Sequence, residues 1–319
     1  MRCSLAALLR ATVVLGLVVF SCHTAEGEEV SVKKNEASID VLVGDKLFTT
    51  YHFKSGAKPV LWPIHGPHEL EMTRAYPLRE GDKGEATDHI HQRSFWFTHG
   101  DVDGVSFWHE TEGHGNIVQK ELVKAEGGDV ATIVTKNDWQ NATGEKLLED
   151  QRTLRFGVDP SGRYIDFDIV LTASEKDVKF GDTKEGMFGI RVAESMRADI
   201  KDAAKKGRIF NSEGQINDAA WGKPAAWVDY SGLVKDQQVG IAILNHPTSF
   251  RHPTHWHVRT YGLFAANPFG LHDFKAVTEG DGSHVLKKGE SIAFRYRVLF
   301  HEGDEKKGDI VSAWNRYVK

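Results

Sequence analysis

Cysteine is nearly absent from this sequence of 319 residues: its two cysteines, Cys3 and Cys22, lie close to the N-terminus. The rest of the chain contains no thiol that could form a disulfide, act as a nucleophile or bind a metal as a thiolate. Long apolar runs are absent too. Ala11–Phe20 is an apolar run of ten residues, whereas a membrane-spanning helix needs about 20. We therefore expect no stable transmembrane helix.

The apolar run has the features of a secretory signal peptide. Two arginines lie on its N-terminal side, and small residues precede a cleavage position after Gly27. We predict that residues 1–27 are a signal peptide and that the mature protein is exported to the periplasm or the extracellular space. Lipid attachment at Cys22 is an alternative that fits less well, because bulky Phe20 lies within that motif.

Charge of one sign is not concentrated anywhere. The chain has 40 Lys and Arg against 45 Asp and Glu, a formal net charge of −5, and no basic run. Nucleic-acid binding requires clustered cations, so this class is excluded. A small molecule or a glycan is the partner that we expect.

Alternating apolar and polar residues predict β-strands along most of the chain. Ile39–Val43 and Leu47–Phe53 flank Gly44-Asp45, and Gln151–Val158 and Tyr164–Leu171 flank a second turn, which is the pattern of β-hairpins. Apolar residues alternate with polar ones over residues 292–300. Further predicted strands are Ala131–Lys136, Phe188–Val192, Ala226–Tyr230, Val239–Leu244 and His255–Tyr261.

Helical periodicity is scarce. It is clear only in the last twelve residues, with Asp309 as the predicted cap, and residues 198–206 form at most a short helix. No repeat or linker divides the chain. We predict an all-β fold, one large antiparallel β-sandwich domain over residues 28–319 with a short C-terminal helix.

Histidines occur in two short blocks. Of the 16 histidines, five lie within His89–His114 and four within His246–His257. Residues two apart share one face of a strand, so His89 with His91, and His255 with His257, would each present two imidazoles to one space. Packing of single histidines among aromatic residues is the structural alternative.

Three interpretations of these blocks remain open. In a glycan site, His and carboxylate side chains transfer protons and interleaved aromatic rings stack on the sugar. In a metal site, His89 and His91 would bind Zn, Cu, Fe or Ni. A non-catalytic binding module would use the same surface, and composition does not separate binding from turnover.

Glu185 is the carboxylate that we select as a candidate base. It directly precedes a predicted strand, Gly186 permits a close approach, and Arg191 follows on the same segment. The alternative is a solvated turn. Asn267 is a weaker candidate.

Four segments resemble one known family. The stretches Asp88–Trp108, Asp182–Arg191, Trp227–Gly232 and Gly240–Gly270 resemble the PmoA-like family, exported proteins of polysaccharide-degrading bacteria that carry the label methane oxygenase. The family pattern Asp-His-Pro-His-His-Arg-Gly has its counterpart in residues 88–94, where Gln92 replaces the third histidine. Methane oxidation is not carried over, because the membrane subunit of particulate methane monooxygenase consists of transmembrane helices.

The last predicted hairpin, residues 286–300, is similar to that of galactose-mutarotase-like supersandwiches. This resemblance implies a large two-sheet sandwich whose concave face holds sugars, and it is an analogy of fold.

Together these observations predict an exported carbohydrate-active protein in which one histidine acts as acid and Glu185 as base. The reaction would be of the epimerase, lyase or hydrolase type, and no cofactor is expected. The alternatives are a glycan-binding module and an oxygenase with a divalent metal on His89 and His91. The predicted catalytic residues are His89, His91, His99, Glu185, His255 and His257. The predicted substrate-binding residues are Arg93, Trp96, Trp108, Arg191, His246, His252, Trp256, Tyr261 and Asn267.

Overall fold

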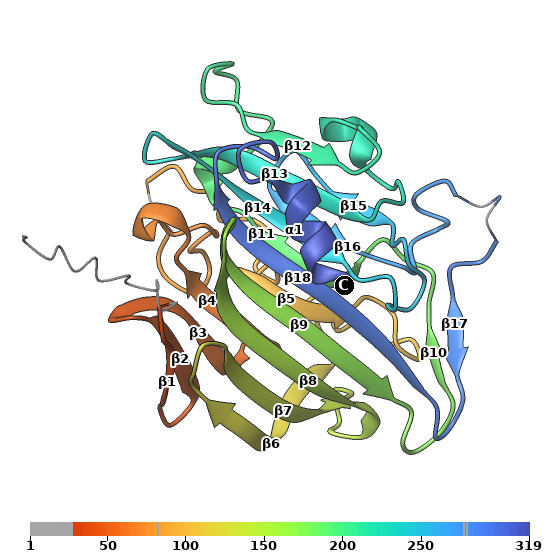
Figure 1. Ribbon diagram of the computed structural model, residues 1–319. Helices are drawn as coiled ribbons and strands as arrows, with labels where there is room; N and C mark the ends of the chain where they lie inside the picture. Colours follow the sequence, from red (N-terminus) through yellow and green to blue (C-terminus); the bar gives the residue numbers. More distant parts are fainter. Residues whose placement is uncertain (1–27, 82, 277, 279) are drawn as a thin grey trace, which may run out of the picture.

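The computed structural model describes residues 28–319 except residues 82, 277 and 279. Two eight-stranded antiparallel sheets pack against each other, and a two-stranded ribbon lies beside them (Figure 1). The prediction of an all-β antiparallel sandwich with a short C-terminal helix is therefore confirmed. Over the described residues, no helix is long and apolar enough to cross a membrane. The predicted signal peptide, with both cysteines, lies outside the described residues.

The first sheet has the strand order β1-β2-β3-β4-β5-β11-β16-β15. Its strands are β1 (Val30–Lys34), β2 (Ser38–Val43), β3 (Lys46–Ser55), β4 (Lys58–Ile64), β5 (Phe95–His99), β11 (Gly186–Arg191), β16 (Leu263–Ala266) and β15 (Trp256–Val258). The second sheet has the order β12-β13-β14-β18-β9-β8-β7-β6. Its strands are β12 (Arg208–Asn211), β13 (Trp227–Val234), β14 (Gln237–Asn245), β18 (Ser291–Glu302), β9 (Gly162–Thr172), β8 (Lys146–Asp159), β7 (Ala131–Gln140) and β6 (Asn116–Glu126).

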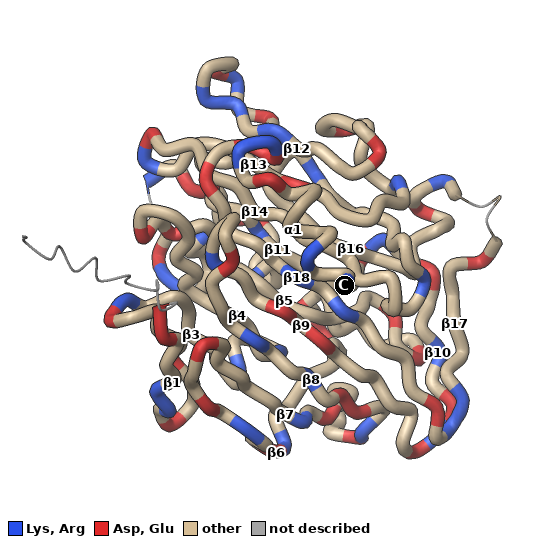
Figure 2. Tube along the Cα trace, viewed as in Figure 1, with Lys and Arg blue, Asp and Glu red and all other residues tan. Residues whose placement is uncertain are grey.

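Shorter elements complete the fold. The ribbon pairs β10 (Val178–Phe180) with β17 (His284–Leu286). Three short 3-10 helices are η1 (Pro67–Glu69), η2 (Glu194–Met196) and η3 (Asn217–Ala220), and the one α-helix of the described residues is α1 (Ile310–Tyr317). Lys and Arg are interspersed with Asp and Glu over the visible trace, without a patch of one sign (Figure 2).

Both predicted hairpins are confirmed. In the first, Val43 pairs with Lys46, so Gly44 and Asp45 alone form the turn, and Gly44 adopts a φ of 59° that favours glycine. The strand before this turn alternates between buried and half-buried residues, as expected for a sheet with one face on the core. In the second hairpin, Asp159 pairs with Gly162.

Two predicted elements differ from the structure. The strand expected over His255–Tyr261 is limited to β15, because Gly262 N donates to the Arg259 carbonyl and turns the chain back into β16. Residues 198–206, predicted to form at most a short helix, form none. Ala198 N and Asp199 N donate to the Thr260 carbonyl instead, which competes with helical hydrogen bonds.

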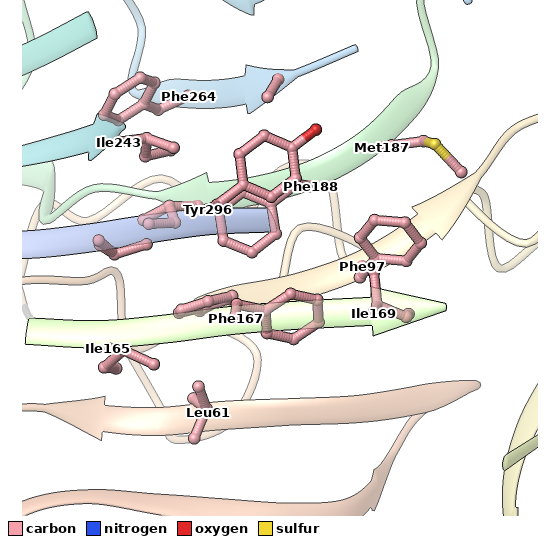
Figure 3. Packing of buried hydrophobic residues seen from close by; sticks show 14 of the residues in the cluster. Leu61, Phe97, Ile165, Phe167, Ile169, Met187, Phe188, Ile243, Phe264 and Tyr296 are labelled. Carbon is pink, nitrogen blue, oxygen red and sulfur yellow. The ribbon is translucent and has the colours of Figure 1, made fainter. Parts of the chain in front are cut away.

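The main core lies between the two sheets. Phe97 and Phe188 of the first sheet meet Phe167 and Tyr296 of the second, and the Phe188 and Tyr296 rings stack at a centroid distance of 4.5 Å (Figure 3). Such aromatic pairs add about 0.5–1.5 kcal/mol beyond the burial of their area.

Helix α1 covers part of the outer face of the second sheet (Figure 1), where Ile310 and Ala313 pack with Leu244 and Leu299. Asp309 occupies the predicted N-cap position, but its side chain makes no capping hydrogen bond and its φ is 48°. The face of the first sheet that points away from the core carries the candidate site.

Candidate active site

One row of residues crosses the first sheet on the face turned away from the core. His257 pairs with Ala265, Ala265 with Gly189, Gly189 with Trp96, and Trp96 with Val60. Residues in register lie on one side of a sheet, so these five share a face. A Cβ on Gly189 would lie 2.6 Å from Trp96 Cζ2, so glycine allows the indole to lie across β11. An apolar cluster forms the floor of this face: Val60, Trp96, Trp108, Leu263 and Ala265.

Seven polar or aromatic side chains, most of them in contact with the next, lie around this floor. We call this set the histidine surface: His89, His91, His109, Glu185, His257, Arg259 and Tyr261. His89 and His91 come from the connection between β4 and β5, and His109 comes from the connection between β5 and β6. Glu185 directly precedes β11, and the last three come from β15 and the turn after it. Residues that are up to 172 positions apart in the sequence, His89 and Tyr261, therefore face each other with ring centroids 5.5 Å apart.

His91, His109 and Glu185 form one side of the histidine surface. The rings of His91 and His109 lie 4.8 Å apart, and His109 Nε2 lies 3.9 Å from Glu185 Oε2. Burial, with the nearby charge of Lys58, lowers the pKa of His91 from 6.5 to about 3. His91 is therefore neutral at neutral pH, while the His109 side chain is 40% exposed and accessible to a ligand.

His257 is fixed in one tautomer by the backbone. Its Nδ1 lies 2.7 Å from the Lys184 carbonyl oxygen, which only accepts hydrogen bonds, so Nδ1 carries the proton. Burial lowers the pKa of His257 to about 4, although the charge of Glu185 opposes this effect. At neutral pH the imidazole is uncharged and its Nε2 presents a lone pair, which is the form of a proton acceptor.

Arg259, the cationic side chain of the histidine surface, lies next to the rings of Tyr261 and Trp221. The guanidinium of Arg259 lies 5.6 Å from the Trp221 ring centroid and 5.7 Å from that of Tyr261. On Tyr261, the His89 ring stacks with an interplanar angle of 12°. Arg259 thus stays next to two aromatic rings by cation–π contacts.

Two buried arginines position the loop that carries His89 and His91. Arg74 Nη1 donates to Asp88 Oδ1 at 2.8 Å, and Asp88 Oδ2 lies 2.8 Å from His89 Nδ1. Arg191 Nη1 donates to Gln92 Oε1 at 2.6 Å. Burial, with the repulsion from Arg74, lowers the pKa of Arg191 to about 10. Gln92 thus accepts a hydrogen bond from a buried guanidinium through its side-chain oxygen. A neutral histidine at this position would have to accept that bond through a ring nitrogen, which has a different geometry.

Glu110 anchors the other end of this loop. It accepts hydrogen bonds from Lys58 Nζ at 3.0 Å and from Arg93 Nε and Nη2 at 3.0 and 2.7 Å. Burial alone would raise the pKa of Glu110, but the hydrogen bonds from Arg93 and the charge of Lys58 lower it to about 2. Burial lowers the pKa of Lys58 to about 8 despite this carboxylate.

Comparison with known families adds one firm assignment. The profile of the family of unknown function DUF6807 matches residues 38–315. The chain belongs to this family. No curated protein matches the sequence.

Some solved structures are similar to this chain at low sequence identity. A galactose mutarotase-like protein from Clostridium acetobutylicum is 9% identical, with a TM-score of 0.36 over 86% of this chain and 99% of that chain. A galactose mutarotase related enzyme from Lactobacillus acidophilus is 11% identical, with a TM-score of 0.32 over 86% of this chain and 97% of that chain. The PmoA-like resemblance has no counterpart in these comparisons.

The DUF6807 chain brings five predicted site residues to the histidine surface, namely His89, His91, Glu185, His257 and Tyr261. His89 and His91 are not on a strand as expected. They lie in a turn where His89 has a φ of 47° and Gln92 N donates to the His89 carbonyl. Even so, their ring centroids are 5.8 Å apart.

Four other predicted residues lie beneath or beside the surface. Arg93 pairs with Glu110, Arg191 with Gln92, and Trp96 and Trp108 are buried in the floor.

Six predicted residues lie away from the histidine surface or below it. His99 is fully buried, with Nε2 2.9 Å from the Gly181 carbonyl oxygen. The Asn267 amide donates to the Thr183 carbonyl, and Trp256 Nε1 donates to the Ala225 carbonyl in the core. His246 contacts Tyr317 of α1, His252 Nδ1 lies 2.8 Å from Asn245 Oδ1, and buried His255 stacks on Phe274.

Sequence reasoning did not select His109, Arg259, Gln92 or Trp221. His109 lies in the first histidine block and Arg259 follows His257 by two residues, so their positions carried a signal. Trp221 is remote in sequence from both blocks, and only the fold brings it to Arg259.

The metal alternative requires several ligand side chains around one point. Within the described ranges, no group of three or more His, Cys, Asp or Glu side chains is arranged to hold a metal ion. The metal alternative at His89 and His91 stays a prediction.

A cavity of about 1160 Å³ is lined in part by Arg74, which also donates to the His89 carbonyl. Arg74 lines it together with Glu71, Arg79, Glu194 and Arg197, and His65 is its one histidine among the described residues. The cavity and the histidine surface do not coincide. We take the histidine surface as the candidate site, because neutral His257 lies there near Glu185, and Glu185 adjoins the exposed His109.

Proposed function

We propose that this protein is exported and acts on a sugar or glycan at the histidine surface by acid–base chemistry. One observation supports this proposal above the others: Glu185 adjoins His109 on one side and lies close enough to His257 to affect its pKa on the other. Such a group places a proton acceptor beside a proton donor, and general acid–base catalysis contributes about 10²–10⁴-fold to enzymatic rates.

The side chains have distinct roles in the proposal. Neutral His257 accepts a proton from the sugar through Nε2, and the Glu185–His109 pair returns one. Trp221 and Tyr261 offer aromatic surface beside the site. Isomerases, lyases and glycosidases all need one proton acceptor and one donor, so these roles suit each of the three reaction classes.

Variants at the two acid–base groups test the proposal. Purified protein would be incubated with neutral and acidic mono- and oligosaccharides, with binding measured by calorimetry and products by mass spectrometry and NMR. We expect His257→Gln and Glu185→Gln to lower turnover about 100-fold or more with little change in binding. His68→Ala, on exposed η1, is the matched control and should keep full activity.

The outcomes separate the alternatives. Binding of a sugar without any product would favour the glycan-binding module, and near-stoichiometric Zn, Cu, Fe or Ni in active protein would favour the metal alternative. If no sugar binds or reacts, or if both variants keep full turnover, the proposal is wrong.

A further inference from the structure

The histidine surface carries more positive than negative charge in its walls. Six cationic side chains adjoin it: Lys58, Arg74, Arg93, Lys184, Arg191 and Arg259. Four carboxylates contact these residues: Asp88, Glu110, Glu185 and Asp273. The whole chain has a net charge of −5, so this local excess of cations is opposite in sign to the protein as a whole.

The carboxylates are already shared among five of the cations. Glu110 serves two of them, Asp88 serves two, and Glu185 lies 3.3 Å from Lys184 Nζ. Asp273 accepts a hydrogen bond from the Lys184 backbone. In the part of the chain that the structure describes, Arg259 is the one cation of this set without a carboxylate within 4 Å.

Among the described residues, none accepts a hydrogen bond from the Arg259 side chain, which is held by ring contacts instead. Its contacts are with the rings of Trp221 and Tyr261, and it is half-buried. A guanidinium has five N–H donors in a planar fork that matches a carboxylate in two parallel hydrogen bonds. Its position between two rings limits the conformational entropy that binding would cost.

We propose that Arg259 binds a carboxylate of the substrate, so that the histidine surface takes an acidic sugar, a uronate. This inference rests on the proposed function and specifies its substrate class. A uronate carboxylate on Arg259 places the pyranose ring toward His257, which lies close enough to both Arg259 and Glu185 for their charges to affect its pKa.

A matched pair of ligands tests the proposal: methyl β-D-glucuronide and methyl β-D-glucoside, which differ only at C6. Binding to the wild-type protein and to Arg259→Gln and Arg259→Lys would be measured by calorimetry or NMR titration at low and high salt. We expect the wild-type protein to bind the glucuronide about tenfold tighter or more, because a charge-assisted hydrogen bond contributes about that factor. High salt should reduce this preference.

The Arg259 variants should lose the preference for the glucuronide but still bind sugars. Arg259→Gln should bind both glycosides with the affinity of the wild-type protein for the glucoside, and Arg259→Lys should recover only part of the preference, because it keeps the charge without the planar fork. Arg155→Gln is the control, since Arg155 pairs with Asp168 on the second sheet. It should leave the preference unchanged.

Other results would overturn the inference. If the wild-type protein binds the glucoside equally well, or if Arg259→Gln weakens both ligands equally, Arg259 does not select a carboxylate. If a 6-sulfated glucoside binds as tightly as the glucuronide, the assignment to a carboxylate is wrong. If neither acidic nor neutral sugars bind, the proposed function itself fails, which distinguishes the two failures.

Discussion

Replacing Glu110 by glutamine should destabilise the loop that carries the histidines by about 3 kcal/mol. Arg93 would lose a two-pronged charge-assisted contact, a loss of about 1.5–3 kcal/mol. Lys58 has a pKa of about 8. At pH 7 it can therefore become neutral for about 1.4 kcal/mol, because one pKa unit corresponds to 1.36 kcal/mol. The loss at Lys58 is therefore at most about 1.4 kcal/mol. Added to the loss at Arg93, it gives a total of about 3 kcal/mol.

Urea denaturation at pH 7, followed by tryptophan fluorescence, measures this loss. Glu121→Gln is the matched control, because Glu121 pairs with Lys136 at the exposed surface and should cost less than about 1 kcal/mol. The double variant Glu110→Gln with Lys58→Met should be more stable than Glu110→Gln alone, since it leaves no buried ammonium without a partner. A loss for Glu110→Gln no larger than that for Glu121→Gln would refute the reasoning.

Two further changes should alter stability. Gly189→Ala should lower the free energy of unfolding by about 1–3 kcal/mol, since the added Cβ would lie 2.6 Å from Trp96 and force the indole aside; an unchanged melting temperature would contradict this packing. Acidification should also destabilise the protein, because the folded pKa values of His91, His99 and His257 are about 3, 4 and 4, below the ordinary 6.5. The stability from each neutral imidazole is complete above pH 6.5 and is lost as pH falls toward the folded pKa, by about 1.4 kcal/mol per pH unit for each histidine. Equal free energies of unfolding at pH 7 and pH 5 would show that these histidines are not buried as neutral groups.

The strands that the sequence predicted well are those with one face on the core. Apolar residues occupy every second position from Ile292 to Phe300, and burial in β18 (Ser291–Glu302) alternates as far as Val298. By contrast, β15 and β16 are short and buried on both faces, so alternation is missing from them. β11 is also buried along its whole length, yet a strand was predicted over most of it, at Phe188–Val192. β16 was not predicted, and the strand predicted over His255–Tyr261 was too long, because turn geometry at Gly262 ended it.

The candidate site was predicted only in part for a similar reason. His255 and His257 share a periodicity of two, and both rings lie 6.1 Å from the ring of Phe274, so the spacing predicted their closeness. His246 and His252 belong to the same block in sequence and lie away from the surface, because β14 ends at Asn245 and the chain crosses between sheets after it. Closeness in sequence did not imply closeness in space.

The residues themselves determine much of this protein before any folding is considered. The absence of cysteine after residue 27 excludes disulfides and thiolate chemistry there, alternation of apolar residues requires sheets, and the two histidine blocks supply groups that are able to transfer protons. Only the tertiary structure decides which histidines lie together and in which protonation state. Strand register places His257 opposite Ala265 and Gly189, and burial makes His91 and His257 neutral. The physical reason is that desolvation and long-range contacts, such as that between Arg259 and Trp221, depend on the whole packed chain rather than on any one segment.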